Sequence, residues 1–205
     1  LKTMNAFQKF LIPFTAVYSF KTYREVKKLI RENKIDIVHV HNTLMVVSPS
    51  VFYAAFHCHV PVVQTLHNFR MLCPAGSYFR GDRICEECSE KGLQCSLKYG
   101  CYRGSKAQTF VSAAILKIHR MLGTYRKVNF ICLTEFNREK LSRLNEGGKQ
   151  IVDMKKVYIK PNFTFQEGIS GEVQKAGDYF LVVGRVEALK GIDVVVKAFE
   201  KIPDQ

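Results

Sequence analysis

The sequence contains no apolar run of the roughly 20 residues that a helix needs to cross a bilayer; its longest apolar stretches are interrupted by His, Lys or Pro. It also shows no internal repeat, no low-complexity segment and no secretory leader, although it begins with Leu1 rather than Met. These absences argue against a membrane-spanning protein and a repeat protein. With 205 residues, 47% of them hydrophobic, we expect a globular chain with a substantial core, cut short at its N-terminus.

Acidic residues are scarce in the first part of the chain. Residues 1–162 carry 26 Lys and Arg against 11 Asp and Glu, whereas residues 163–205 carry 5 against 7. An asymmetry of this kind indicates separate units with different partners. A basic unit can meet nucleic acid, an anionic membrane or a phosphorylated substrate, or can simply be a solvated surface, so charge alone leaves these four open.

Short β-branched segments alternate with amphipathic ones along the chain. We predict buried strands over residues 35–41, 62–66, 128–133, 156–160 and 178–185. We predict helices over residues 16–32, 48–57, 105–125, 134–144 and 191–202. Strands that alternate with helices favour an α/β fold with parallel sheets. Residues 163–177 are aperiodic and contain Gly, which is typical of a linker between two such units.

The segment VGRVEALKG (183–191) carries the strongest functional signal. The segment combines a predicted strand with a turn at Gly184, the cations Arg185 and Lys190, and the start of a helix. This combination suits the binding of a diphosphate leaving group. Arg185 can hold phosphate oxygens in a bidentate manner, and Lys190 adds a point charge. The alternative is an ordinary strand–helix turn with two exposed cations.

Two His-Asn pairs follow the first two predicted strands: His41 and Asn42, then His67 and Asn68. Ligands of open parallel sheets bind beyond the carboxyl ends of the strands, so both pairs are candidate binding residues. We take His67 as the better catalytic candidate, against the alternative of a packed or solvated histidine. We expect His39, inside the first strand, to be structural.

Five of the seven cysteines lie within residues 73–101. The odd count and the missing leader favour reduced thiols over a disulfide framework. Four of the five can form a tetrathiolate zinc site, for which we choose Cys73, Cys85, Cys88 and Cys101 and leave Cys95 as the spare. Zinc would order the aperiodic loop 67–105. Free thiols or a redox pair are the alternatives.

These features together resemble the retaining glycosyltransferases of family 4, which have the GT-B fold. The resemblance extends over nearly the whole chain and rests on DIVHVHN (36–42), PVVQTLHNFRMLCP (61–74), CYRGS (101–105), KPNF (160–163) and VGRVEALKG (183–191). Each segment alone is weakly informative, but in this order they are specific. The cysteine-containing stretch resembles a subset that builds bacterial surface polysaccharides.

The resemblance implies two Rossmann-like domains that face a cleft. The acceptor-side domain would be residues 1–162, incomplete at its start, and residues 178–205 would be the first β-α unit of the donor-nucleotide domain. It places Arg185 and Lys190 on the donor diphosphate and His67 near the transferred sugar. We take the remaining substrate-binding candidates to be His41, Asn42, Asn68, Asn162 and Gly184. No catalytic divalent metal is expected, since the cations would stabilise the leaving group, and no protein nucleophile is needed for retention.

Two features of the resembling enzymes are missing from the sequence. A Gly-rich loop should precede residue 1, and a pair of glutamates spaced E-x7-E should follow Gln205. We therefore expect this chain to be an inactive fragment of a hexosyltransferase. The whole enzyme would move a sugar from a nucleotide-diphosphate sugar to a glycan or lipid-linked acceptor during cell-surface polysaccharide synthesis.

The basic charge supports two further expectations. Basic amphipathic segments at 16–34 and 106–127 favour a cytoplasmic protein that docks on the anionic inner face of the cell membrane. The alternative function is a zinc-stabilised nucleic-acid-binding protein. Nucleic acid is the weaker choice of partner, because the aromatic residues occupy predicted core positions and are not interleaved with Lys and Arg.

Overall fold

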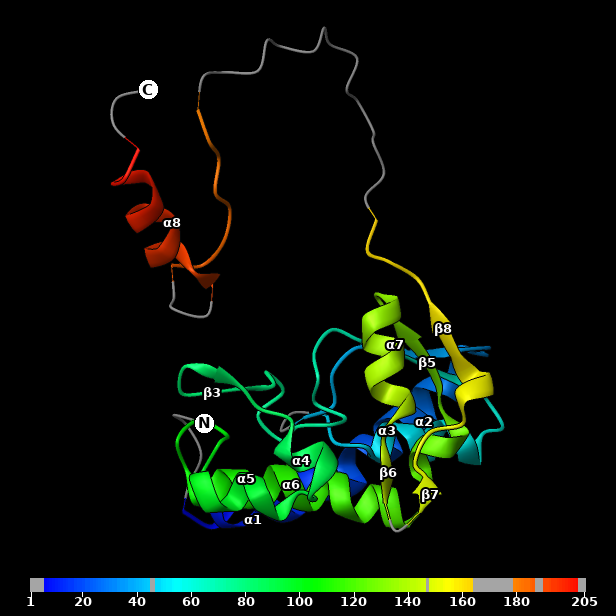
Figure 1. Ribbon diagram of the computed structural model, residues 1–205. Helices are drawn as coiled ribbons and strands as arrows, with labels where there is room; N and C mark the ends of the chain where they lie inside the picture. The colour runs from blue at the N-terminus through cyan, green and yellow to red at the C-terminus, as the bar shows by residue number, and fades with distance from the viewer. Residues whose placement is uncertain (1–5, 45–46, 147, 164–178, 187–189, 203–205) are drawn as a thin grey trace, which may run out of the picture. The chain divides into compact units, whose positions relative to one another are not determined.

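The computed structural model describes residues 6–44, 47–146, 148–163, 179–186 and 190–202. The chain divides into two compact units, Leu1–Phe163 and Thr164–Gln205 (Figure 1). Each unit is described by itself below. No helix within the described ranges combines the length and the apolar character that a bilayer span requires.

A parallel four-stranded sheet forms the centre of the first unit. Its strands are β1 (Val38–Val40), β2 (Val62–Leu66), β5 (Asn129–Cys132) and β8 (Val157–Ile159), paired in the order β1-β2-β5-β8. Every neighbouring pair in this sheet is parallel. The prediction of an α/β fold with a Rossmann-like parallel sheet is therefore confirmed.

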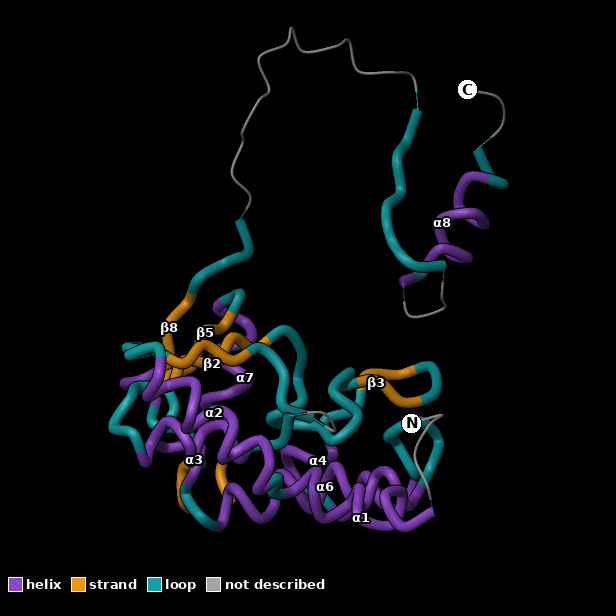
Figure 2. The backbone as a smooth tube through the Cα atoms, turned by 180° about the vertical axis from the view of Figure 1, so that it is seen from behind, coloured by secondary structure: helices purple, strands orange, loops and turns teal. Residues whose placement is uncertain are grey.

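Helices surround this sheet and extend to one side of it (Figures 1 and 2). They are α1 (Ala6–Val17), α2 (Phe20–Glu32), α3 (Ser50–His57), α6 (Lys106–Met121) and α7 (Glu135–Ser142), with short 3-10 turns at Thr124–Lys127 and Met154–Lys156. Helix α2 packs on α3, and α1 runs along α6. Ser105 and Thr134 cap α6 and α7 as their sequences predict, because each hydroxyl accepts a backbone N–H of the first turn.

The helix predicted over residues 16–32 is in fact two helices separated at Ser19. The hydroxyl of Ser19 accepts the N–H of Thr22, which starts α2, and the backbone N–H of Ser19 donates to Oγ of buried Ser48 at 3.1 Å. The prediction was wrong here because Ser19 was not recognised as a helix cap, a role in which the bond to Ser48 also holds it.

Apolar side chains from both faces of the sheet make the main core. Phe52, Val62, Val128, Phe130 and Leu141 are all almost completely buried within it. No residue of the central strands β2 and β5 is exposed, whereas the edge strands β1 and β8 expose His39 and Tyr158.

The cysteine-containing segment has more regular structure than predicted. It forms a small hairpin, β3 (Phe79–Arg80) with β4 (Arg83–Ile84), followed by the short helices α4 (Glu87–Glu90) and α5 (Gln94–Tyr99). Cys88 and Leu93 from this segment pack on Ala113 and Leu116 of α6. A second small hairpin, β6 (Asn145–Glu146) with β7 (Lys149–Gln150), follows α7.

The second unit contains α8 (Ile192–Phe199), which confirms the helix predicted there. The strand predicted over residues 178–185 is wrong for residues 179–185, which form no strand; residue 178 lies outside the described residues. A strand needs a hydrogen-bonded neighbour, and the described part of this unit offers no second strand to pair with. Phe180 instead rests against Phe199 of α8, with ring centroids 5.1 Å apart.

Buried His119 joins three helical segments of the first unit. Its Nε2 lies 3.0 Å from the carbonyl oxygen of Val17, which can only accept, so Nε2 carries the hydrogen. Its Nδ1 then accepts from the hydroxyl of Tyr53 at 3.0 Å, and that hydroxyl lies 2.6 Å from Oγ1 of Thr124. Burial lowers the pKa of His119.

We predict that acid destabilises the fold through this histidine. Because the pKa of His119 is lower in the folded protein, the unfolded chain binds a proton first as the pH falls. Stability is therefore fully present above the ordinary histidine pKa of about 6.5 and is lost below it. Urea unfolding measured between pH 8 and pH 5 checks this. His119→Gln should flatten the pH dependence and the exposed control His59→Asn should not; an unchanged slope in His119→Gln would contradict the prediction.

Candidate active site

The two His-Asn pairs meet at the carboxyl edge of the sheet. Strands β1 and β2 are adjacent and parallel, with Val38 opposite Val62, so the residues that follow each strand come to the same edge. His41, Asn42, His67 and Asn68 all line one pocket there. Its volume of about 40 Å³ suits a few water molecules and not a sugar ring, so a substrate would lie over this pocket.

The histidines at this edge form a stack. His41 Nδ1 lies 2.7 Å from His67 Nε2, and the two rings are stacked with centroids 5.0 Å apart. One nitrogen of this pair carries the hydrogen and the other accepts it, so the bond is lost if both rings are protonated. Nε2 of His67 is thus occupied by a protein partner, so a ligand of this ring would have to meet Nδ1.

His39, which we expected to be structural, belongs to the same stack and does not lie in the core. It is exposed to solvent, its ring lies 4.5 Å from that of His41, and its Nε2 lies 2.8 Å from Oγ1 of Thr65. Partial loss of solvation lowers the pKa of His39, and the nearby His41, His67 and Lys160 lower it further. A neutral His39 therefore favours the stack at neutral pH.

Asn42 and Asn68 shape the chain as it leaves each strand. The side-chain oxygen of Asn42 accepts the N–H of Leu44 at 3.1 Å, and that of Asn68 accepts the N–H of Arg70 at 2.9 Å. Both are turns of the kind that Asn forms readily. Their carboxamide NH₂ groups are the parts suited to donate to a substrate.

Two residues of this pocket were not predicted from the sequence. Gln64, in β2, is only 8% exposed, and its Oε1 has no hydrogen-bond partner among the described residues. Arg70 is held by the carbonyl oxygen of Pro74 at 2.5 Å and lies over the ring of Tyr102. A polar residue in the middle of an otherwise apolar strand was the signal that could have found Gln64.

The remaining predicted substrate residues lie elsewhere. Asn162 follows β8 and is exposed, and it does not line the strand-end pocket. Gly184, Arg185 and Lys190 belong to the second unit, where all three are exposed. Their roles remain predictions.

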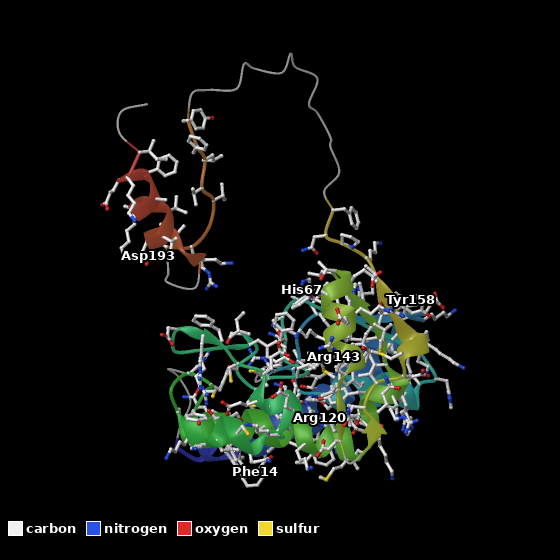
Figure 3. All side chains as sticks on the ribbon, viewed as in Figure 1. Phe14, His67, Arg120, Arg143, Tyr158 and Asp193 are labelled. Carbon is white, nitrogen blue, oxygen red and sulfur yellow. The ribbon has the colours of Figure 1, made fainter. Side chains whose placement is uncertain are left out.

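Lys190 lies at the start of α8. Gly191 caps this helix with φ of +65°, a conformation that suits glycine. The positive end of the helix therefore lies beside the cation, as a phosphate site requires. Asp193 also stands in the first turn of α8 (Figure 3), where the positive end of the helix favours a carboxylate as it would favour a phosphate.

Five thiols of the cysteine-containing segment influence one another. Burial raises the pKa of Cys88 to about 12, and the nearby Cys73, Cys101 and Cys95 add to the effect. Burial also raises the pKa of Cys101, and the nearby Cys73 and Cys85 raise it further. All are free thiols. Across the described ranges, no three His, Cys, Asp or Glu side chains are placed to hold a metal ion, so zinc at Cys73, Cys85, Cys88 and Cys101 stays a prediction.

A family model supplies the decisive comparison. The model of Glycosyltransferase Family 4 matches residues 6–145, more than half of the chain. The chain belongs to Glycosyltransferase Family 4. No curated protein and no solved structure matched it in the corresponding comparisons.

Membership of Glycosyltransferase Family 4 supports a sugar-transferring enzyme that uses a donor and an acceptor. The matched residues include His41, His67 and their asparagines, so the strand-end pocket lies within the family region. The match ends before Asn162 and the turn of the second unit.

The zinc prediction for this family 4 protein is tested by metal analysis. We expect about one equivalent of zinc in the purified protein, and loss of the metal together with protease cleavage of the loop in Cys88→Ser. Cys58→Ser, outside the cysteine segment, is the control and should keep the metal. A metal-free protein whose loop resists protease would refute the site.

Proposed function

We propose that this glycosyltransferase moves a hexose from a nucleotide-diphosphate sugar to a glycan or lipid-linked acceptor, with retention of configuration, in cell-surface polysaccharide synthesis. The observation that carries the proposal is the convergence of His41, Asn42, His67 and Asn68 at the carboxyl edge of a parallel sheet, within the region that matches the family. Ligands of open α/β sheets bind at such an edge. No observation in the described residues favours the alternative of a nucleic-acid-binding protein.

On the acceptor side, His67 positions the reacting groups. Its ring is held by the 2.7 Å contact with His41 and by stacking on the same residue. A ring held in this way keeps Nδ1 in one place, where it can meet a hydroxyl of the sugar or acceptor. Holding reactants in a fixed geometry lowers the entropic part of the barrier.

On the donor side, Arg185 and Lys190 stabilise the leaving diphosphate. When the bond between the sugar and the diphosphate oxygen breaks, its electron pair stays on that oxygen, and negative charge grows there. Cations beside the start of α8 gain interaction energy at this moment, and the proposal requires no divalent metal. Gly184 and Asn162 are proposed to line the substrate.

We predict that, in the full-length enzyme, Lys190→Ala lowers kcat by about 10²–10³, or about 3–4 kcal/mol, and weakens donor binding far less. Arg185→Lys should also lower kcat although it keeps the positive charge, because a point charge cannot reproduce a bidentate guanidinium. The exposed Lys197→Ala, later in α8, is the matched control. Release of nucleoside diphosphate from a panel of UDP-, GDP- and TDP-sugars gives the rates, and calorimetry gives the affinity. Normal turnover of both cation variants at saturating donor would show that the diphosphate is held elsewhere.

His67→Ala serves as the acceptor-side comparison in the same assays. It should lower turnover by loss of positioning while the affinity for the free nucleoside diphosphate stays nearly unchanged. His59→Asn, another exposed histidine, should leave both quantities unchanged. Product configuration determined by NMR tests retention, and inversion would contradict that part of the proposal.

We also propose that the protein docks on the anionic inner face of the cell membrane through α2. Its exposed basic residues Lys21, Arg24, Lys28 and Arg31 recur every three or four positions and so share one face. Lys21 pairs with Glu25 at 3.9 Å and Lys28 with Glu32 at 3.7 Å. Both ion pairs are mostly solvent-exposed, so they compete only weakly with anionic lipid head groups for the two lysines.

The docking prediction is tested with vesicles. Binding to anionic vesicles should fall steeply with salt and should lose about 1 kcal/mol per removed contact in Arg24→Gln and Arg31→Gln. Lys149→Gln on β7 is an exposed basic control that should bind normally. Equal binding to neutral and anionic vesicles would show that the basic face is only solvated surface.

A further inference from the structure

A second cavity of the first unit lies away from the strand-end pocket. It has a volume of about 630 Å³ and is formed by the α4–α5 segment, α6 and the start of the β6–β7 hairpin. None of its lining residues also lines the strand-end pocket. The volume falls in the range of small-molecule sites.

One wall of this cavity is apolar. Phe110, Ala114 and Ile118 are spaced by four residues and so share one face of α6, and Leu93 and Leu97 face the same cavity from the α4–α5 segment. Phe110 is 62% exposed although it is a large aromatic residue. An exposed apolar stripe along a cavity of this size suits an apolar chain.

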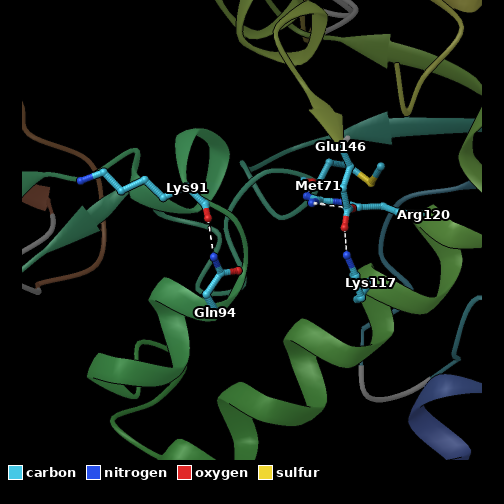
Figure 4. A network of polar contacts seen from close by, with 6 residues as sticks. All are labelled: Met71, Lys91, Gln94, Lys117, Arg120 and Glu146. Atoms are coloured by element: carbon cyan, nitrogen blue, oxygen red, sulfur yellow. Dashed lines mark hydrogen bonds and ion pairs between the residues drawn. The ribbon is translucent and has the colours of Figure 1, made fainter. Parts of the chain in front are cut away.

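The cavity is also lined by charged residues, several of which are drawn in Figure 4. Arg120 of α6 is only 7% exposed; one of its terminal nitrogens donates to the carbonyl oxygen of Met71 at 2.7 Å, and the other lies 3.7 Å from Oε2 of Glu146. The Oε1 atom of Glu146 accepts from Lys117. Two cations therefore share one carboxylate.

The hydrogen-bonding capacity of Arg120 is not exhausted. Within the described residues, Nε of Arg120 and Oε2 of Glu146 both lack a hydrogen-bond partner, although both atoms are buried. A buried ion pair that is incompletely hydrogen-bonded is energetically unfavourable. An anion bound beside the exposed Lys117 would add negative charge where two cations share one carboxylate.

We propose that this cavity binds a single-chain amphiphile with an anionic head group. The chain lies along the Phe110–Ala114–Ile118 stripe, and the head accepts hydrogen bonds from Arg120 and Lys117. The sign of the head follows from the lining, which contains three cations (Lys91, Lys117 and Arg120) and two carboxylates (Glu90 and Glu146). Fatty acids and alkyl or prenyl phosphates share this chemistry. The inference does not depend on the transferase proposal.

Calorimetric titration with four C12 compounds below their micellar concentrations tests the ligand class. Dodecyl phosphate or lauric acid should bind saturably at one site, dodecanol more weakly, and dodecylamine not at all. Comparison of the two anions distinguishes a phosphate from a carboxylate head. Each methylene removed from the better anion should weaken binding by about fourfold. Equal binding of dodecylamine and the anions, or no saturable binding of either anion, would overturn the proposal.

Two pairs of variants locate the site. Ala114→Trp fills the apolar end and should weaken binding at least tenfold, while Ala107→Trp, exposed on the same helix, should bind normally. Lys117→Gln should weaken anion binding about tenfold and leave dodecanol binding unchanged, whereas Lys106→Gln should change neither. Thermal unfolding verifies that each variant is folded. Unchanged anion affinity in folded Ala114→Trp would place the ligand elsewhere and refute the site.

Discussion

The parallel pairing of β1 with β2 is the constraint on which the proposed active site depends. It places the ends of two strands, 26 residues apart in the sequence, at one edge of the sheet and lets His41 approach His67 to 2.7 Å. Buried Val40 and Leu66 anchor these strand ends. Because side chains alternate between faces, a shift of one residue in either strand would turn its apolar side chains out of the core.

Helix α6 is the second organising element, since it links the sheet domain to the cysteine-containing segment. Ser112 donates to the carbonyl oxygen of Pro74 at 2.9 Å, and Arg120 donates to that of Met71, so two turns of one helix hold the chain that leaves the strand-end pocket. His119 of the same helix contacts α1 and α3 through Val17 and Tyr53. Figure 3 labels His67 and Arg120, which belong to the two separate pockets of this unit. The same helix therefore supports the edge where sugar transfer is proposed and walls the cavity proposed for an amphiphile.

Local rules predicted much of this architecture. The strands at 62–66 and 128–133 were recognisable as short, mostly apolar segments, and no residue of either is exposed in the fold. The starts at Ser105 and Thr134 were recognisable because a capping hydroxyl acts within its own first turn. His67 was recognisable as a candidate because it follows a strand, and ligands of parallel sheets bind beyond the strand ends.

The sequence by itself determined the alternation of strands and helices, the helix caps and the residue types at the strand ends, because these depend on neighbours within a few positions. Only the tertiary structure decided what depends on distant contacts. Ser48 holds the backbone of Ser19 from a distant segment, and His39 stacks outward against His41 and bonds Thr65. Residues 179–185 form no strand because a ladder needs a second strand. The buried Arg120 beside Glu146 also arises from segments brought together by folding, since neither residue in the linear sequence indicates that a cation will be enclosed with an unpartnered Nε.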